Sequence, residues 1–590
     1  MNERTVPTVP PAPIAGAMRR VVKKGYGLAD LRADLLAGLV VGVVALPLSM
    51  ALAIAVGAPP QHGLYTAIVG GLVIAPLGGS KFQVSGPTAA FVVILSPILH
   101  EHGLSGLLTA GLMAGIVLVS LGVLRLGNLI RYVPYPVTTG FTAGIAVVIA
   151  TLQLRDALGL QIATMPEAWH EKLIALWVAR GTFSPFEAGI AALTILILAG
   201  LSDRSRYVPA PLVAIVTATL AGVALSRFSG IEVATIGSRF APPGGGEVIP
   251  FGLPTPSLPW GDDFSFGLVR ELFPSAFAIA MLGAIESLLS AVVSDAATGT
   301  RHDPDSELVA QGVGNIVAPF FGGIAATGAL ARTATNIRAG ARSPVAAVTH
   351  SVVILLSTLA LGPVVAWIPM ASLAGLLLVV AWNMSERHNF GGLLRVAPRS
   401  DVTVLLTCFL LTILFDMTVA VTVGFLLAAV LFMRRMSEIS DAKFVPVLDA
   451  TEEEGGERHL PDGVGLYEIN GPLFFGAAQK AMDRLHGAPG LPHRVLVLHL
   501  GRVPVIDATG FAALENMCRY LVHHGVQVVL AGPLPRPRAV FDRADLPRAY
   551  PGVHVAPSLD AALELAEGLA KRTEGKRRRD RRTPTHPPTR

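Results

Sequence analysis

The stretch QVSGPTAAF, residues 83–91, lies inside an apolar region, between GGSK at 78–81 and a run that ends near Leu99. Ser85 suits the N-cap of a helix, and Pro87 suits the first helical position, where its missing N–H costs nothing. Gly86 allows the backbone to approach another group closely. The pattern predicts a short extended piece that stops in mid-membrane and a half-helix that begins there.

A helix N-terminus in mid-membrane is a predicted anion site. Its free N–H groups and the positive end of its dipole would face a cavity. Hydrocarbon does not tolerate such a break unless the break lines a protein cavity. The alternative is a Pro-kinked transmembrane helix without a ligand, because Pro and Gly are common in such helices. The local sequence leaves both open.

The composition indicates a polytopic membrane protein. The chain has 590 residues, of which 52% are hydrophobic and only 15% charged. Cys408 lies in an apolar run and Cys518 in the C-terminal part, so we expect no disulfide. The sequence contains no metal-ligand spacing and no nucleophile or cofactor constellation. We therefore expect neither an enzyme nor a metal or organic cofactor, and we expect the basic tail to be solvated rather than bound to nucleic acid.

The apolar segments form two groups of seven, separated by a polar, Gly/Pro-rich stretch at 228–265. The first group lies near 35–56, 62–78, 87–99, 104–124, 135–153, 185–201 and 208–226, and the second near 270–293, 307–321, 327–340, 344–366, 369–384, 401–415 and 417–433. Several are too short to cross a bilayer alone. We expect a cytoplasmic lead at 1–30 and a helical membrane domain of 14 spans at 31–440, with repeats about 35–226 and 268–437.

The two groups echo each other. PLGG at 76–79 precedes the first broken segment, and PFFGG at 319–323 precedes IAATGA at 324–329, in the third span of the second group. An odd number of spans per repeat inverts the second copy, so the two half-helix N-termini would meet near the midplane. Paired interrupted segments are the best sequence pointer to a transporter site.

Two ionisable residues within spans are functional candidates, because burying them is costly. Glu286 shares a helix face with Ser290, four residues on. Arg332 is placed a little over one turn into the second half-helix, where its charge would add to the dipole field. The alternatives are a buried partner of a Ser or Arg for Glu286, and a snorkelling side chain for Arg332.

Basic residues such as Arg204, Arg342 and Arg434 fall in alternate loops shared with the N-terminus, so the positive-inside rule predicts cytoplasmic termini. From Val464 the pattern changes to expected strands at 464–469, 473–475, 495–500 and 526–530 and helices at 477–485 and 509–523. This alternation predicts a small cytoplasmic α/β domain at 459–570, followed by a basic, disordered tail at 571–590.

These residues resemble a known family over nearly the whole chain. The motifs are ALPLSMA at 45–51, GLY at 63–65, VSGPT at 84–88, GT at 299–300, GVGN at 312–315 and RTATN at 332–336. They are similar to those of bacterial SulP (sulfate permease) anion transporters, a family that also has animal solute-carrier members. VIDATG at 505–510 is similar to the signature of a STAS domain.

The resemblance implies an inverted repeat divided into core and gate subdomains, working as a homodimer in the bacterial inner membrane. It places a small anionic substrate between the third and tenth spans. Carried over to this sequence, the substrate-binding residues are Ser85, Gly86, Pro87, Thr88, Ala326, Thr327, Gly328, Ala329 and Arg332.

The resemblance also identifies Glu286 as the carboxylate of the eighth span. Sodium-coupled bicarbonate members have Asp there, with Thr four residues on. Glu286 and Ser290 depart from that pattern, which argues against a sodium site and favours proton coupling or exchange. An apolar surrounding favours the protonated form of a carboxyl, so Glu can carry a proton near neutral pH.

Substrate choice is not legible from the anion-site residues. The stretches 276–294 and 380–386 resemble the C4-dicarboxylate uptake branch, so we expect succinate, fumarate or aspartate on resemblance alone. Sulfate or bicarbonate transport (with or without sodium) and anion exchange are the alternatives. The remaining alternative is a membrane scaffold, surrounded by lipid, that transports nothing and binds a cytoplasmic protein through its STAS domain.

In related anti-sigma-antagonist STAS proteins, the Ser or Thr before the glycine is phosphorylated. Thr509 occupies that place, next to Asp507 and at a predicted helix N-terminus, where a phosphate is electrostatically favourable. The alternative is that Asp507 and Thr509 simply cap the helix.

Overall fold

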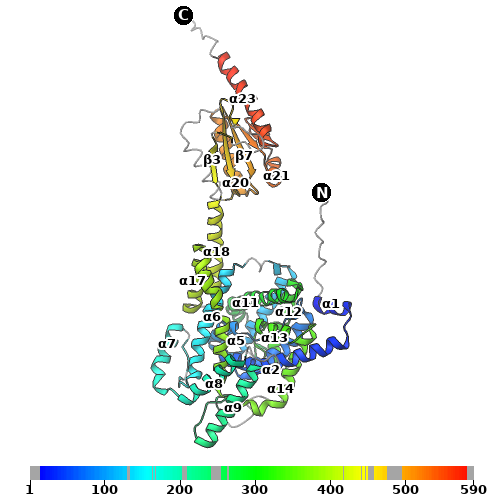
Figure 1. Ribbon diagram of the computed structural model, residues 1–590, viewed down its shortest axis with the longest axis vertical. Coiled ribbons are helices and arrows are strands. Elements are labelled where there is room, and N and C mark those ends of the chain that lie inside the picture. The colour runs from blue at the N-terminus through cyan, green and yellow to red at the C-terminus, as the bar shows by residue number, and fades with distance from the viewer. Residues whose placement is uncertain are drawn as a thin grey trace. The chain divides into compact units, whose positions relative to one another are not determined.

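The computed structural model describes residues 14–128, 133–162, 164–166, 168–201, 209–240, 254–261, 265–415, 417–439, 441–445, 447–448, 458–474 and 494–580. The chain divides into two compact units, Met1–Ala428 and Ala429–Arg590. Figure 1 shows the first as a bundle of helices and the second as a sheet with helices.

Helices make up almost all of the first unit. In its first half these are α1 (Gly16–Lys24), α2 (Leu28–Val56), α3 (Pro60–Tyr65), α4 (Gly71–Leu77), α5 (Ala89–Val123), α6 (Tyr135–Ala157), α7 (Trp169–Val178), α8 (Pro185–Leu201) and α9 (Ala210–Ser229). The second half holds α10 (Ile236–Phe240), α11 (Phe266–Thr298), α12 (Pro304–Val317), α13 (Leu330–Arg338), α14 (Val345–Val365), α15 (Met370–Met384), α16 (Arg387–Val396), α17 (Arg399–Leu414) and the start of α18 (Met417–Ile439). A helix lies at each predicted span; α5 contains two of them, separated by a kink at Gly103 (φ 65°).

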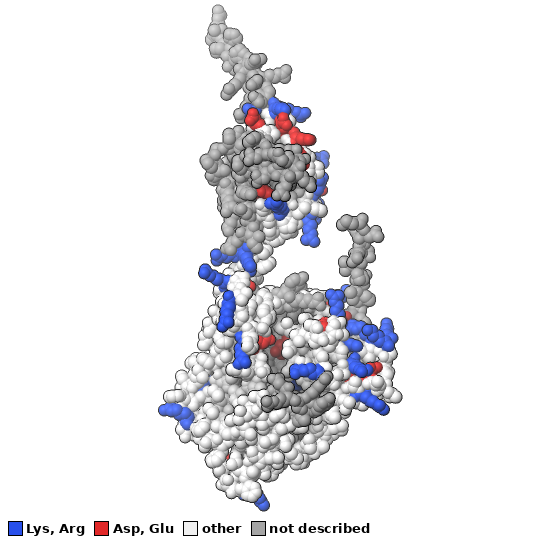
Figure 2. Space-filling view, viewed as in Figure 1, with Lys and Arg blue, Asp and Glu red and all other residues white. Residues whose placement is uncertain are grey.

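Within the described residues, seven helices are long and apolar enough to cross a membrane, or eight if the bent pair Trp169–Thr182 and Pro185–Leu201 is one span. The other predicted spans are shorter helices. The surface of this unit is mostly uncharged in Figure 2, and it exposes large apolar side chains such as Leu196 and Leu220, as contact with lipid requires. The first unit is therefore a polytopic membrane domain.

The two halves repeat one local pattern. A π-helical turn at Thr66–Gly70 joins α3 to α4, and a 3₁₀ turn at Ala318–Phe321 follows α12. Each half then continues through a Gly-Gly pair into a two-residue strand, β1 (Ser85–Gly86) or β2 (Thr327–Gly328), and then into a helix. The strands pair antiparallel, Ser85 with Gly328 and Gly86 with Thr327. The two interrupted segments thus meet, as the repeated motif predicts.

Two details of the prediction are wrong. The N-cap of α5 is Thr88 and the helix begins at Ala89, because Ser85 and Gly86 belong to the paired strand instead. Similarly, α13 begins at Leu330, so Arg332 lies in its first turn rather than beyond it.

Small residues bring the helices of the two halves into close contact. A Cβ on Gly115 of α5 would lie 2.7 Å from the carbonyl oxygen of Gly312, and a Cβ on Gly312 of α12 would lie 2.7 Å from that of Gly115. The two backbones therefore touch directly, which is the usual role of small residues between membrane helices. This contact holds α12 against α5.

The second unit contains a five-stranded sheet in the order β3-β6-β7-β8-β9. Its strands are β3 (Asp441–Val445), β6 (Val464–Asn470), β7 (Val495–Arg502), β8 (Gln527–Ala531) and β9 (Val553–Ala556), and its helices are α20 (Ala508–His523), α21 (Pro535–Ala544), α22 (Leu546–Ala549) and α23 (Leu559–Asp580). A separate pair joins β4 (Val447–Leu448) to β5 (Arg458–His459). Only β3 runs antiparallel to its neighbour in the larger sheet; the other pairs are parallel.

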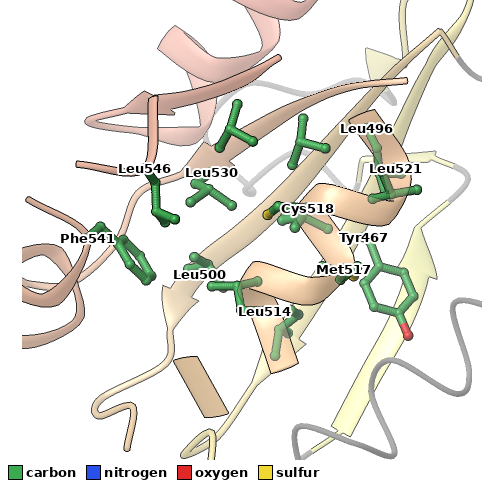
Figure 3. Close-up of a cluster of buried hydrophobic side chains, with 14 of the residues drawn as sticks. Tyr467, Leu496, Leu500, Leu514, Met517, Cys518, Leu521, Leu530, Phe541 and Leu546 are labelled. Atoms are coloured by element: carbon green, nitrogen blue, oxygen red, sulfur yellow. The ribbon is translucent and has the colours of Figure 1, made fainter. Parts of the chain in front are cut away.

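Alternate residues of the strands face opposite layers of helix. Leu496, Leu498 and Leu500 join a buried cluster with α20, α21 and α22, which Figure 3 shows around Cys518 and Phe541. Val495 and Val497 join a second cluster with α23. Helices therefore cover both faces of the sheet, as a parallel sheet requires.

The predicted limits of this domain were too narrow. Because β3 pairs with β6, the sheet begins at Asp441 rather than after residue 459. At the other end, α23 continues to Asp580, so residues 571–580 are helical instead of disordered. Lys, Arg and Glu, which make up most of this stretch, are good helix formers. The helix expected at 477–485 lies outside the described residues.

Cys518 is expected to resist alkylation in the native protein. Its side chain is fully buried, and burial raises the pKa of the thiol to about 12, so the reactive thiolate is absent. In a Cys408→Ala background, maleimide should label Cys518 only after denaturation, as measured by mass spectrometry. Rapid labelling of the native protein would contradict the closed packing around α20.

Candidate functional site

The candidate site is formed where α5 and α13 begin. The strand pair β1–β2 joins the two approaching segments, and the N–H of Ala329 donates to the carbonyl of Val84 at 2.8 Å. The N-cap residues are Thr88 and Ala329, and neither side chain accepts a hydrogen bond from its helix. Both N-termini thus lack the side-chain acceptor that usually caps a helix, which leaves them suited to an anion.

Thr88 connects the first half-helix to Glu286. The hydroxyl of Thr88 donates to the Oε2 atom of Glu286 at 2.9 Å, and both side chains are partly exposed. A carboxylate on α11 therefore lies directly beside the N-terminus of α5. Its protonation would change the charge next to any bound anion.

Arg332 brings a cationic group to the same place from α13. Its side chain is only 3% exposed. One terminal nitrogen, Nη2, donates to Ser49 Oγ and to the carbonyl of Pro87, each at 3.2 Å. Within the described residues, Nε and Nη1 have no hydrogen-bond partner. A buried guanidinium with free donors is suited to binding an anion.

Gly86 is required by this arrangement. A Cβ at this position would lie 2.3 Å from Nη1 of Arg332 and 3.7 Å from the nearest backbone atom, Cα of Ala67. The glycine therefore makes room for the guanidinium, rather than for a turn of the chain.

The other predicted binding residues are buried around this point. The hydroxyl of Thr327 donates to the carbonyl of Gly283 at 3.0 Å, and the N–H of Ala326 donates to Asn315 Oδ1 at 2.7 Å. Ser290 is fully buried. Its hydroxyl donates to Thr333 Oγ1 at 3.2 Å, so it supports α13 and makes no hydrogen bond to Glu286 that the structure describes.

A row of polar side chains on α12 was not predicted as part of the site. Glu307, Gln311 and Asn315 are almost fully buried and follow one another every four residues. The amide of Gln311 donates to Ser85 Oγ at 2.8 Å and to Glu307 Oε1 at 3.1 Å. Through Gln311, the row therefore contacts Ser85 of β1. Its period of four, in an apolar span, is the signal in the sequence that could have identified it.

Glu307 also holds the segment that leads into β1. Its Oε2 atom accepts from the N–H of Gly79 at 2.9 Å and from that of Ser80 at 3.0 Å. Burial of this carboxylate is compensated by three hydrogen bonds, so it serves to position the chain.

Gln83 is a further residue that the sequence did not single out. Its side chain is buried, and neither amide atom has a hydrogen-bond partner within the described residues. A Cβ on Gly328 would lie 1.9 Å from its Nε2 atom, which places the amide directly against β2. It is a further polar group beside the two half-helices.

The predicted regulatory pair lies in the second unit. Asp507 is the N-cap of α20, and its Oδ1 accepts from the N–H of Gly510 at 2.6 Å. Thr509 is exposed. Asp507 therefore provides the cap, and Thr509 is an exposed residue next to it.

Opposed half-helix N-termini, a buried arginine and a neighbouring carboxylate define a class of protein: a membrane transporter with an anion site. Discontinuous helices in matching positions of two repeats are its structural signature. Among the described residues, no group of three His, Cys, Asp or Glu side chains could hold a metal ion.

Comparison with known proteins identifies the family. The chain belongs to the sulfate permease family, whose profile matches residues 31–408, and a STAS domain profile matches residues 458–562. It is an anion transporter with several membrane spans and a C-terminal STAS domain.

Two curated relatives cover most of the chain. It is 41% identical over 526 residues to the putative sulfate transporter YvdB of Bacillus subtilis, covering 89% of this chain and 95% of that protein. It is 30% identical over 559 residues to the bicarbonate transporter BicA of a Picosynechococcus species, covering 91% and 95%.

Solved structures agree with this fold. The overall structure of SLC26A9 matches with a TM-score of 0.80 and 20% identity, over 94% of this chain and 93% of that one. The transmembrane domain of a cyanobacterial BicA matches with a TM-score of 0.59 and 29% identity, over 67% and 98%.

Proposed function

We propose that this protein is a secondary active transporter that takes up a small anion together with a proton. The observation that carries the proposal is the hydrogen bond between Thr88 and Glu286, because it joins a titratable group to the N-terminus of a half-helix. The substrate would bind between Ser85–Thr88 and Ala326–Ala329, with Arg332 supplying a positive charge.

Coupling follows from the electrostatics of the site. An ionised Glu286 repels an anion at the neighbouring N-terminus of α5, whereas a protonated Glu286 does not. Binding of the anion and binding of the proton therefore favour each other, as linkage requires. A proton gradient directed inward would drive uptake. Ser290, which supports Thr333, would hold α13 in place during this cycle.

Glu286→Gln is expected to remove gradient-stimulated uptake. The amide keeps the size of the side chain but cannot exchange a proton, so uptake into proteoliposomes should no longer rise when the external pH is lowered. Glu271→Gln, an exposed carboxylate on the same helix, is the matched control and should behave like the unchanged protein. Full stimulation in Glu286→Gln would refute the coupling role of this residue.

The substrate is tested in the same vesicles. YvdB, named a putative sulfate transporter, is similar over nearly the whole chain, which makes sulfate the first anion to test. Bicarbonate follows from the similarity to BicA, and succinate or fumarate from the resemblance of 276–294 and 380–386. Labelled sulfate, bicarbonate and succinate should be compared with and without a proton gradient. Replacing sodium by choline should leave uptake unchanged.

We further propose that both termini face the cytoplasm and that the protein works as a homodimer. The alternating basic loops support the orientation.

The position of Thr509 on the exposed start of α20 supports a regulatory or partner-binding surface on the STAS domain. Uptake of none of the anions tested would instead favour a scaffold that uses this domain.

A further inference from the structure

A basic cavity lies beside α1, away from the transport site. Its volume is about 350 Å³, and its wall includes Lys24, Lys81, Arg342, Asp30, Tyr26 and Phe82. Three cationic side chains face a single carboxylate. Arg342 is paired with that carboxylate, its Nη1 atom lying 2.8 Å from Asp30 Oδ1. Lys24 and Lys81 form no ion pair within the described residues, although the charge of Lys81 also acts on Asp30. Three cationic side chains thus outnumber the one carboxylate of the wall, and the wall carries a net positive charge.

The wall of the cavity is held in place by a fully buried carboxylate, Asp34. Its oxygens accept from the hydroxyl of Tyr26 at 2.7 Å, from the N–H of Arg342 at 2.6 Å and from the N–H of Ser343 at 3.0 Å. Burial and the bond to Asp34 raise the pKa of Tyr26 to about 12, so the phenol stays neutral and adds no negative charge. The cavity is therefore preformed, which lowers the entropic cost of binding.

The cavity also contacts the connectors of both half-helices. Lys81 and Phe82 belong to the segment that leads to β1, and Ala341 and Arg342 follow α13. Asn336 of α13 donates to the carbonyl of Phe82 at 2.9 Å. A ligand in this cavity would thus touch the two segments that carry Ser85 and Arg332.

The neighbouring helix is suited to a membrane surface. Basic residues of α1 include Arg19 and Lys23, and Figure 2 shows lysine and arginine side chains gathered on the side of the unit where α1 lies. Ala17 and Val21 pack inward, while Val22 is 67% exposed. A short helix with basic and exposed apolar residues is typical of the lipid headgroup region.

We propose that this cavity binds a phosphate group, either the headgroup of an anionic phospholipid or inorganic phosphate, and thereby braces the two half-helix connectors. The ammonium groups of Lys24 and Lys81, the latter 5.6 Å from the centre of the Phe82 ring, and the guanidinium of Arg342 match the charge and acceptor atoms of a phosphate. The bound group would be regulatory, because no residue of the cavity wall belongs to the transport site.

The test measures the melting temperature of the purified full-length protein without transported anions. Nanodiscs of phosphatidylcholine are compared with nanodiscs containing phosphatidylglycerol, and phosphate is titrated into the first kind. Lys24→Ala/Lys81→Ala should raise the ligand concentration needed for half of the maximal shift in melting temperature by roughly tenfold or more, since hydrogen bonds to charged groups are lost. Arg19→Ala/Lys23→Ala is the control. It removes the same amount of charge from exposed positions of α1 that do not line the cavity, and it should retain the response.

The possible outcomes distinguish a lipid headgroup from free phosphate, and they distinguish both from failure of the proposal. Stabilisation by phosphatidylglycerol that depends on Lys24 and Lys81 identifies a headgroup, and stabilisation by phosphate in the neutral lipid that depends on the same two lysines identifies the free anion. Stabilisation by phosphate that both double variants retain would place the phosphate at the transport site and overturn the proposal. Equal loss in both double variants, or no stabilisation by either, would overturn the proposal and leave only diffuse attraction of α1 to anionic surfaces. None of these readouts requires transport, so they are independent of the proton-coupled mechanism.

Discussion

Gly86→Ala is expected to reduce uptake by roughly 10- to 100-fold, the effect of losing one charge-assisted contact of about 1.5–3 kcal/mol. The added methyl group would lie 2.3 Å from Nη1 of Arg332, so the guanidinium must leave its position between the half-helices. The side chain can move, whereas the nearest backbone atom is already at an ordinary distance of 3.7 Å. The protein should therefore fold and melt nearly normally while it loses substrate binding.

Gly111→Ala is the matched control for this prediction. Gly111 is buried in α5 as well, but its added methyl group would meet no atom closer than 3.8 Å. Uptake and melting temperature should both be preserved. Normal uptake in Gly86→Ala, measured with the anion that the unchanged protein transports, would mean that Arg332 does not contribute to the site.

Glu307→Ala is expected to cause the largest loss of stability. It leaves three buried donors without their acceptor, the N–H groups of Gly79 and Ser80 and the amide of Gln311. Each unsatisfied buried donor costs about 1–3 kcal/mol. The segment 78–84 would lose its attachment to α12, and the yield of folded protein and its melting temperature should fall sharply.

Glu307→Gln should be tolerated much better. Gln311 Oε1 has no hydrogen-bond partner within the described residues, so this amide can turn over. Its oxygen then accepts from the new amide at position 307 and from the hydroxyl of Ser85, to which its nitrogen donated before. The remaining oxygen at 307 can still accept from Gly79 and Ser80. If alanine and glutamine lowered the melting temperature equally, the negative charge itself, and not the hydrogen bonds, would hold the segment.

Much of this fold is legible in the sequence. Apolar length predicts the spans, and the matching PLGG and PFFGG motifs predict that two interrupted segments correspond. In the structure Glu286 and Arg332, the two charges singled out within the spans, contact Thr88 and Pro87 of the first interrupted segment. Local hydrophobicity and breaks in it carry this information because the bilayer imposes them on the chain.

The details that failed depend on tertiary contacts. Ser85 satisfies the local rules for an N-cap, but pairing with Gly328 takes it into a strand instead. The part played by Glu307 depends on Gly79 and Ser80, which lie more than 200 residues away in the chain. In the second unit, β3 is too far from β6 in sequence for local alternation to predict their pairing.

The pairing of β1 with β2 has a consequence for biosynthesis. Arg332 and Pro87 are 245 residues apart, so the first interrupted segment enters the membrane long before its partner has been made. Until then its backbone groups have no acceptor or donor from the second half, in surroundings where unsatisfied polar groups are costly. Closing so long a loop is also slow. Chains released before residue 328 should therefore be substrates for membrane chaperones and proteases, and folding of the transport domain is expected to be completed only after most of it has been inserted.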